Sequence, residues 1–198
     1  MTTTPTTTFS LCVYCGSRVG TRSAYAALAQ SLGAAIGRRG WTLVYGGGRA
    51  GLMGEVADAA LAAGARVVGV IPESLMRLEV GHANLSELHV VATMHQRKQM
   101  MAERADAFLA MPGGIGTFEE LFEVWSWRHL GYHDRPLGLL DAADYWQPLV
   151  EFLRHAQVEG FMSDAQLAML QIDDDIDRLL DTLAAVPGDP TDDDFERI

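Results

Sequence analysis

The chain has 198 residues, of which 48% are hydrophobic, and it carries a formal net charge of −11. This length suits one domain with a substantial core, and the acidic balance argues against a nucleic-acid-binding surface. No stretch approaches the ~20 continuous apolar residues that a membrane helix needs, and the threonine-rich start lacks the basic and apolar regions of a secretory signal. We therefore expect no membrane association and a cytoplasmic location.

The two ends of the chain differ in composition from the rest. Residues 1–8 are rich in threonine, and residues 187–198 hold five acidic side chains against one arginine. Such polar, charged segments bury too little apolar surface to fold. We expect disorder in residues 1–8 and 186–198, on either side of one folded domain, residues 9–185.

Strand and helix patterns alternate along this domain. Apolar runs typical of buried parallel strands occupy residues 9–15, 41–45, 66–71, 89–91, 107–111 and 136–140. Amphipathic or alanine-rich segments that indicate helices occupy residues 21–39, 52–63, 94–104, 118–130, 145–157 and 175–184. This alternation predicts an α/β fold, a single-domain, doubly wound, Rossmann-like parallel sheet with helices on both faces.

Three glycine-bearing turns follow predicted strands, at Gly16-Ser17, at residues 46–54 and at residues 113–117. In doubly wound sheets, ligands bind beyond the carboxyl ends of the strands, near the point where the strand order switches. We therefore expect all three turns to contribute to one site.

The third turn, Met-Pro-Gly-Gly-Ile-Gly-Thr-Phe-Glu-Glu at residues 111–120, has the strongest signal. Three glycines in four positions remove the Cβ atoms that would keep a ligand from the backbone. The helix that follows begins with unpaired N–H groups and the positive end of its dipole, and the usual anion at such a site is a phosphate. A phosphate site alone would avoid the carboxylates of Glu119 and Glu120, so we infer chemistry beside the phosphate.

Glu120 has two interpretations. Thr117 and Glu120 have the spacing of a capping box, in which the glutamate only stabilises the start of the helix, by ~1 kcal/mol. Alternatively, the carboxylate acts on a ligand. Glu123 adds a third acid beside Glu119 and Glu120, and such crowding is unfavourable unless cations face it.

Candidate cations lie in the segment Met-His-Gln-Arg-Lys at residues 94–98. Arg97 can form a forked contact with a phosphate or carboxylate, and Lys98 supplies a point charge. The alternative is a solvated basic face of a helix. Glu79, in the preceding polar connection, either closes over the site or lies on the surface.

The second turn is ambiguous. Gly46-x-Gly48-x-x-Gly51 matches a dinucleotide fingerprint after a strand, and Glu73 lies about where the ribose-binding acid is expected. Binding of a mononucleotide, or close packing of helix on strand, explains the same glycines. The pattern alone leaves these possibilities open.

Metal and thiol chemistry are not indicated. The six histidines show no metal-ligand spacing, so we expect no metal site. Cys12 and Cys15 form a C-x-x-C, but on a strand these positions point to opposite faces, so we expect two inert cysteines.

The predicted helix at residues 118–130 is apolar on more than one side, because it carries Leu121, Phe122, Trp125 and Trp127. One face must cover the sheet, and a second apolar face usually meets another protein surface. We expect a homodimer formed through this helix.

Two segments together resemble one known family. Residues 112–120, PGGIGTFEE, resemble the PGGxGTxxE motif of the Lonely Guy (LOG) proteins, and residues 94–98 resemble their MHxRK segment. Shorter similarities occur at residues 15–17, 45–54 and 131–138, so the resemblance covers residues 9–185. Arg18 departs from the family's CGSS pattern, in which this position is a serine.

The resemblance implies hydrolysis of the N-glycosidic bond of AMP-type or N6-modified (cytokinin) nucleoside 5′-monophosphates, giving free base and ribose 5-phosphate without a cofactor. By similarity, Arg97 and Glu120 are the catalytic pair. With the glycine turns included, the expected substrate-binding residues are Gly16, Ser17, Gly47, Gly48, Glu79, Arg97, Lys98, Gly113, Gly114, Ile115, Gly116, Thr117, Phe118, Glu119 and Ser126. The alternatives are a nucleotide-binding module without turnover and a NAD-type oxidoreductase.

Overall fold

The computed structural model describes residues 8–76 and 81–185. These residues form a seven-stranded sheet in which every pairing is parallel, in the order β4-β3-β2-β1-β5-β6-β7. The strands are β1 (Ser10–Tyr14), β2 (Thr42–Tyr45), β3 (Arg66–Pro72), β4 (Glu87–Val91), β5 (Ala107–Ala110), β6 (Leu137–Leu140) and β7 (Leu170–Asp173). The predicted single-domain, doubly wound parallel sheet is confirmed.

The strand order switches direction between β1 and β5. From β1 the chain runs outward through β2 and β3 to β4, and it then returns to the other side of β1 and continues through β5 and β6 to β7. The turns after β1 and β5 lie side by side, because Met111 N donates to Tyr14 O (2.9 Å) and Gly16 N donates to Pro112 O (3.1 Å). Their carboxyl ends therefore mark the expected ligand position.

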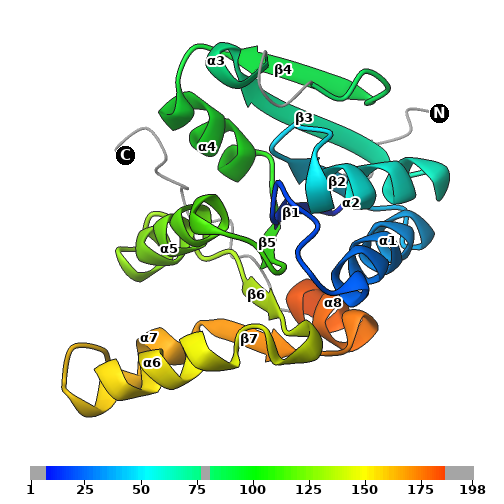
Figure 1. Cartoon of the computed structure of the whole chain (residues 1–198). Helices are drawn as coiled ribbons and strands as arrows, with labels where there is room; N and C mark the ends of the chain where they lie inside the picture. Colours follow the sequence, from blue (N-terminus) through cyan, green and yellow to red (C-terminus); the bar gives the residue numbers. More distant parts are fainter. Residues whose placement is uncertain (1–7, 77–80, 186–198) are drawn as a thin grey trace, which may run out of the picture.

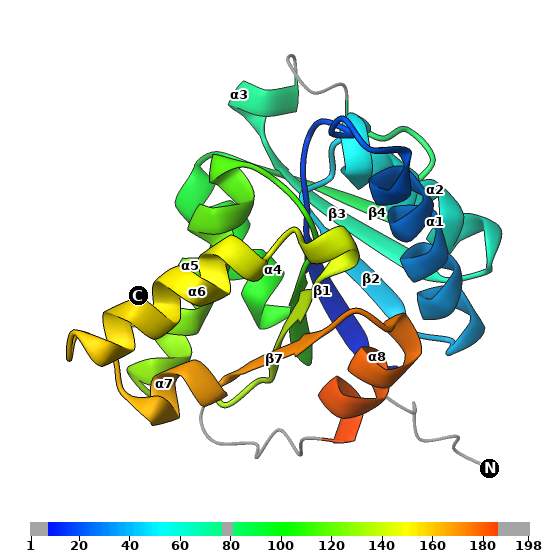
Figure 2. The same ribbon diagram turned by 60° about the horizontal axis from the view of Figure 1, so that its bottom comes forward.

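Helices cover both faces of the sheet (Figures 1 and 2). One face carries α1 (Ser23–Arg38), α2 (Gly51–Ala62) and α8 (Ile176–Ala185), and the other carries α4 (Met94–Glu103), α5 (Ile115–His129), α6 (Gln147–Val158) and α7 (Asp164–Ala168). The short α3 (Glu73–Met76) follows β3, and a 3-10 turn, η1 (Ala142–Asp144), follows β6.

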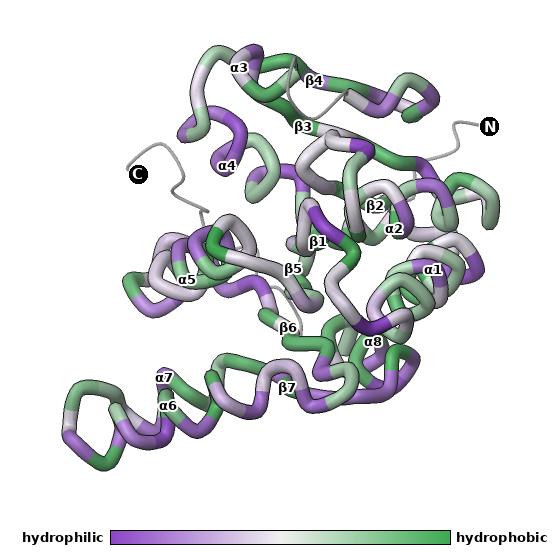
Figure 3. Tube along the Cα trace, in the orientation of Figure 1, coloured by the Kyte–Doolittle hydropathy of each residue, from purple (hydrophilic) through white to green (hydrophobic). Residues whose placement is uncertain are grey.

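Burial follows from this layering. Every residue of β2, β5 and β6 is buried, as expected for parallel strands with both faces covered. The outer helices alternate between hydrophilic and hydrophobic positions along their traces (Figure 3). Each buried leucine or valine side chain contributes about 1.5–3 kcal/mol, so the two apolar layers hold the strand ends, and the turns that follow them, in place.

The two cysteines support the strand assignment of β1. Cys12 belongs to the apolar cluster on the α4–α5 side and Cys15 to the cluster on the α1–α2 side, which confirms that they face opposite sides of the sheet. Both thiols are free and buried, and burial raises the pKa of each thiol. They are inert thiols, as predicted.

Three elements were missing from the sequence prediction: α3, α7 and β7. β7 is a four-residue strand at the edge of the sheet with only Leu170 fully buried, so it lacks the apolar run of the central strands. α7 begins with a capping box in which the Ser163 side chain accepts from Gln166 N. The predicted disorder of residues 1–8 and 186–198 falls almost entirely outside the described residues.

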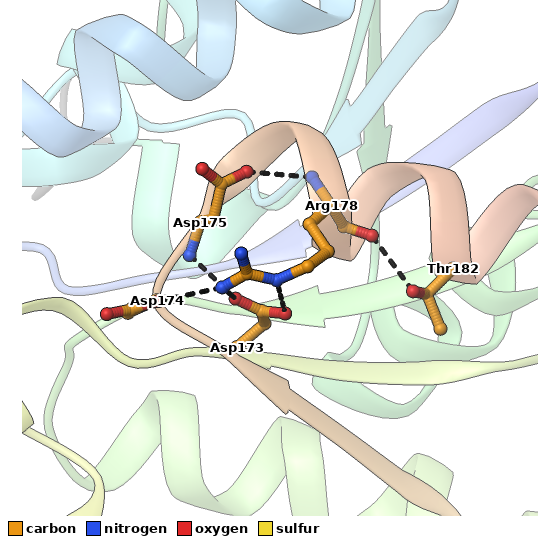
Figure 4. A network of polar contacts seen from close by, with 5 residues as sticks. All are labelled: Asp173, Asp174, Asp175, Arg178 and Thr182. Carbon is orange, nitrogen blue, oxygen red and sulfur yellow. Dashed lines mark hydrogen bonds and ion pairs between the residues drawn. The ribbon is translucent and has the colours of Figure 1, made fainter.

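The turn between β7 and α8 is strongly acidic (Figure 4). Arg178 donates to Asp173 (Nε to Oδ2, 2.5 Å) and to Asp174 (3.1 Å), and the Asp175 carboxylate accepts from Arg178 N (2.8 Å) and so caps α8. The hydrogen bonds from Arg178 are the main reason that the pKa of Asp173 falls from 3.8 to about 2. Asp175, predicted inside the helix, is its capping residue.

No helix within residues 8–76 and 81–185 combines the length and the apolar character needed to cross a membrane.

Candidate functional site

A cavity of about 670 Å³ lies at the switch point of the sheet. Its lining comes from the turns after β1 and β5, the first turns of α1, α2 and α5, one residue of α4 and the segment after β6. The lining residues are Cys15, Gly16, Ser17, Arg18, Val19, Gly20, Thr21, Tyr25, Leu52, Met53, Arg97, Pro112, Gly113, Gly114, Ile115, Gly116, Thr117, Glu120 and Tyr145. All three predicted turns contribute to it, although the second does so only through Leu52 and Met53.

The start of α5 forms one wall of this cavity. Phe118 N donates to Gly114 O (3.0 Å), so the N–H groups of Ile115, Gly116 and Thr117 precede the first helical hydrogen bond and point out of the helix end. A Cβ atom built on Gly114 or Gly116 would meet no atom within 4 Å. The exposed amides and the open space beside them suit an anionic ligand.

The capping-box interpretation of Glu120 is wrong. α5 begins at Ile115 with Gly114 as its N-cap and no side-chain cap, three residues before the predicted start. Thr117 therefore lies inside the first turn, where it is buried. Gly113 leaves room for the Thr117 side chain, since a Cβ on Gly113 would lie 2.0 Å from Thr117 Oγ1. Glu120 falls in the second turn and its side chain lines the cavity.

Glu120 and Arg97 form an ion pair inside the cavity. Arg97 Nη2 lies 3.7 Å from Glu120 Oε1, and the two residues are only 6% and 9% exposed. Arg97 Nε is buried and has no hydrogen-bond partner among the described residues. A buried donor left unpaired costs about 1–3 kcal/mol, so this nitrogen is available for a ligand in the cavity.

Gly46, after β2, makes room for the guanidinium of Arg97. Arg97 Nη2 donates to Gly46 O (3.3 Å), and a Cβ on Gly46 would lie 1.9 Å from that nitrogen. The Thr93 side chain caps α4 by accepting from Gln96 N (3.1 Å), which fixes the helix turn that carries Arg97. The solvated-face alternative for Arg97 is wrong.

Lys98 neutralises the other two acids of α5. Its amine donates to Glu119 and to Glu123 (2.8 Å to Glu123). Partial burial lowers the pKa of Lys98, but the hydrogen bonds to both carboxylates outweigh it and leave that pKa raised. The expectation that cations face the crowded acids is confirmed, and Lys98 lies beside the cavity rather than in its wall.

Several expected binding residues do not line the cavity. Gly47 packs against Ile71 and Leu88, and Gly48 forms an isolated bridge with Gly81. Three further residues also lie outside the lining. The ring of Phe118 packs on Trp146, Glu119 is exposed and pairs with Lys98, and Ser126 is exposed. Glu79 lies outside the described residues.

Tyr145 and Tyr25 also line the cavity, although no pattern in the sequence predicts them there. The Tyr145 hydroxyl donates to Gly113 O, and its ring meets that of Tyr25 edge-on, with centroids 5.8 Å apart. Ala143 and Asp144, directly before Tyr145, have positive φ values of 52° and 58°, which is strained for residues other than glycine. The local sequence does not predict such a turn, because neither Ala143 nor Asp144 is a glycine and their positive φ values depend on the surrounding structure.

No group of three or more His, Cys, Asp or Glu that could hold a metal ion occurs within residues 8–76 and 81–185. The charged side chains that line the cavity are one carboxylate, Glu120, and two arginines, Arg18 and Arg97.

These observations define an α/β protein with a cavity at its topological switch point, lined by Arg18, Arg97, Glu120 and the start of α5. A family model described as "Possible lysine decarboxylase" matches residues 53–183. The cytokinin riboside 5′-monophosphate phosphoribohydrolase of Rhodococcoides fascians is 50% identical over 169 residues, which cover 85% of each chain. One from Arabidopsis thaliana is 47% identical over 153 residues, 77% of this chain and 72% of that protein. The chain belongs to this phosphoribohydrolase family.

Solved structures support the fold. The molybdenum cofactor carrier protein of Chlamydomonas reinhardtii superposes with a TM-score of 0.69 at 20% identity, covering 90% of this chain and 99% of that chain. The molybdenum cofactor binding protein of Rippkaea orientalis gives 0.68 at 17% identity, covering 91% and 98%. Identities this low show a shared architecture alone.

The decarboxylase wording of the family model does not fit this site. Pyridoxal phosphate, the cofactor of such enzymes, binds through a Schiff base with a lysine amine. Lys98 is the only lysine of the chain, and its amine is held by two carboxylates outside the cavity lining.

Proposed function

We propose that this protein hydrolyses the N-glycosidic bond of AMP-type or N6-modified (cytokinin) nucleoside 5′-monophosphates to the free base and ribose 5-phosphate. Family membership supports the reaction class, since relatives at 43–50% identity carry the name of this activity. The observation that carries the proposal is the buried Glu120–Arg97 pair in the same cavity as the open amides of α5.

The spacing along α5 suits a nucleoside monophosphate. Glu120 follows Gly116 and Thr117 by three to four residues, so its backbone lies about 5–6 Å from theirs along the helix axis. A 5′-phosphate held by those amides therefore places its ribose beside the Glu120 carboxylate. The Arg97 Nε that lacks a partner points to a polar group of the same ligand.

This placement lowers the barrier electrostatically. When the C–N bond breaks, the sugar gains oxocarbenium-like positive charge, which a buried carboxylate stabilises more strongly than water does. Glu120 also orients the water whose oxygen bonds to the anomeric carbon as the base leaves with the bonding electrons. Arg97, paired with Glu120, aligns the nucleotide.

Incubation with AMP and with N6-isopentenyl-AMP, followed by chromatography, tests the proposal. We expect free adenine or N6-isopentenyladenine, together with ribose 5-phosphate, from at least one substrate. Adenosine, which lacks the phosphate, should react far more slowly. Absence of free base from both nucleotides would contradict the proposal, and binding without turnover would then favour a nucleotide-binding module.

We also propose that two copies associate through α5. The tryptophans expected to form its second apolar face are not exposed, because Trp125 and Trp127 are buried within the chain. Support comes instead from Ile115 and Phe122, whose side chains remain 84% and 39% exposed, and from the exposed Met94 at the start of α4. A dimer through this face would lie next to the cavity.

Light scattering at micromolar concentration tests the dimer. We expect twice the mass of the chain for the wild-type protein and a monomeric mass for Phe122→Glu, since a carboxylate in an apolar interface lacks a partner. Phe161→Glu, at an exposed phenylalanine after α6, is the matched control and should stay dimeric. A monomeric wild-type protein would contradict the proposal.

A further inference from the structure

Arg18 is the charged residue of the cavity lining that the proposed mechanism does not use. It lies in the turn after β1, is exposed, and lines the cavity. The backbone there is tightly held, because Leu52 N donates to Gly16 O (2.9 Å) and Gly16 N donates to Pro112 O (3.1 Å). Gly51, with φ of +61°, lies so close that a Cβ on it would be 2.3 Å from Arg18 N.

The charges around the cavity make Arg18 unusual. The charged residues of the lining are Arg18, Arg97 and Glu120, and Arg97 and Glu120 pair with each other. Lys98, just outside, is shared by Glu119 and Glu123. No ion pair or hydrogen bond joins the Arg18 guanidinium to another described residue, so its charge is uncommitted.

A nucleotide phosphate needs this charge. Without Arg18, the side chains around the site carry two positive and three negative charges, which is unfavourable for a dianion despite the amides of α5. The turn that carries Arg18 is hydrogen-bonded to the turn after β5, where those amides lie. A guanidinium offers several N–H donors in a geometry that matches phosphate oxygens.

We infer that Arg18 binds the 5′-phosphate and selects phosphorylated nucleosides over unphosphorylated ones. This inference rests on the proposed function for the kind of ligand, although it concerns binding rather than turnover. The long side chain reaches the phosphate from the β1 side while the α5 amides hold it from the other. Arg18 is therefore a specificity-determining residue.

Calorimetric titration of AMP and of adenosine into the wild-type protein, Arg18→Ser and Arg18→Lys tests this inference. Arg18→Ser should weaken AMP binding by about tenfold or more, the loss expected for a charge-assisted hydrogen bond. Arg18→Lys should weaken it by only about threefold, because the charge remains. Adenosine affinity should be unchanged in both variants.

The matched control is Arg38→Ser, which removes the same charge from an exposed position on α1 outside the cavity. Its AMP affinity should stay within about twofold of the wild type, since distant exposed charges are screened by salt. An equal loss in Arg38→Ser and Arg18→Ser would overturn the inference, and so would an equal loss of AMP and adenosine affinity in Arg18→Ser.

These outcomes separate the inference from the proposed function. If AMP binding depends on Arg18 but no base is released, the inference stands and the hydrolase proposal fails. If base is released and Arg18→Ser binds AMP as the wild type does, the hydrolase proposal stands and the inference fails.

Discussion

The part of the chain that the structure describes contains two hollows whose charged groups can be compared. One, of about 670 Å³, is at the carboxyl ends of β1 and β5, and the other, of about 530 Å³, lies between α1 and the start of α8. Both combine arginine with acidic side chains at the start of a helix. They differ in what those side chains do.

In the hollow beside α8, all the charged residues of the lining are exposed. The side chains of Asp174 and Asp177 are 79% and 63% exposed, and arginines already pair with both. In the cavity at the switch point, Arg97 and Glu120 are buried and Arg97 Nε has no partner. Because a buried, unsatisfied polar group costs free energy, its presence points to a ligand more reliably than volume does.

The largest effect on hydrolysis is expected when the carboxylate in the cavity at the switch point is replaced by an amide. The same replacement in the hollow beside α8 is the control. Glu120→Gln keeps the shape of the side chain but removes its charge, so hydrolysis should fall by about 10²–10³-fold. Asp174→Asn makes the same chemical change at the exposed hollow and should leave the rate unchanged. Chromatographic assay of base release, with thermal unfolding to verify folding, measures both. Activity of Glu120→Gln within about threefold of wild type would remove the carboxylate from the mechanism.

A smaller loss is expected from Gly46→Ala. The new methyl group would lie 1.9 Å from Arg97 Nη2, so the guanidinium must move away from Glu120, and kcat/KM should fall by about 10–100-fold. Arg97→Lys disturbs the same contact, so the double variant should be little worse than the poorer single variant. Steady-state kinetics of the three variants provide this measurement. Independent, multiplicative losses would show that Gly46 acts otherwise than through Arg97.

Gly116→Ala should separate binding from stability. The residue lies in the first turn of α5, where alanine is favoured over glycine by up to about 1 kcal/mol, and its methyl group would occupy the open space beside the helix amides. The melting temperature should stay the same or rise, while KM for AMP rises several-fold. Calorimetry and kinetics on the same sample check both parts. An unchanged KM would place the phosphate elsewhere.

The smallest effect concerns Arg178 and acid stability. The pKa of Asp173 is lowered from 3.8 to about 2 in the folded protein. The ionised carboxylate therefore stabilises the folded state at pH values above about 4, and this contribution to stability disappears as pH falls from about 4 to 2. Arg178→Met should leave hydrolysis unchanged, lower stability at neutral pH, and lose less stability on acidification than the wild type. Thermal unfolding across this range measures the difference, and identical pH profiles would contradict it.

Much of the fold was predictable, because long apolar runs and amphipathic segments depend on local sequence. Six strands and the strand–turn–helix order were found in this way. β7 was missed because an edge strand of four residues needs no continuous apolar run. α7 was missed although Ser163 and Gln166 form a true capping box, whereas Thr117 and Glu120 have the same spacing and form none.

The cavity was predictable only in part. The turn at residues 113–117 and Arg97 carry local signals of glycine and charge, and the structure brings both to one cavity with Glu120. Tyr25 and Tyr145 meet there from distant segments, a contact that depends on tertiary packing. Gly47 fits a ligand-binding pattern and a packing pattern equally well in sequence, and only the structure shows that its neighbours are Ile71 and Leu88.

The contact between α1 and α2 leaves no room for a side chain at two positions of α1. A Cβ on Gly33 would lie 2.4 Å from Val56 O, and one on Gly37 would lie 2.4 Å from the Cβ of Ala63. The two helices are therefore closely packed, and the cavity residues Leu52 and Met53 lie on the second of them, α2. We therefore expect any widening of the cavity for a bulkier nucleobase to involve other parts of its wall, such as the segment of Tyr145, where Ala143 and Asp144 have positive φ values.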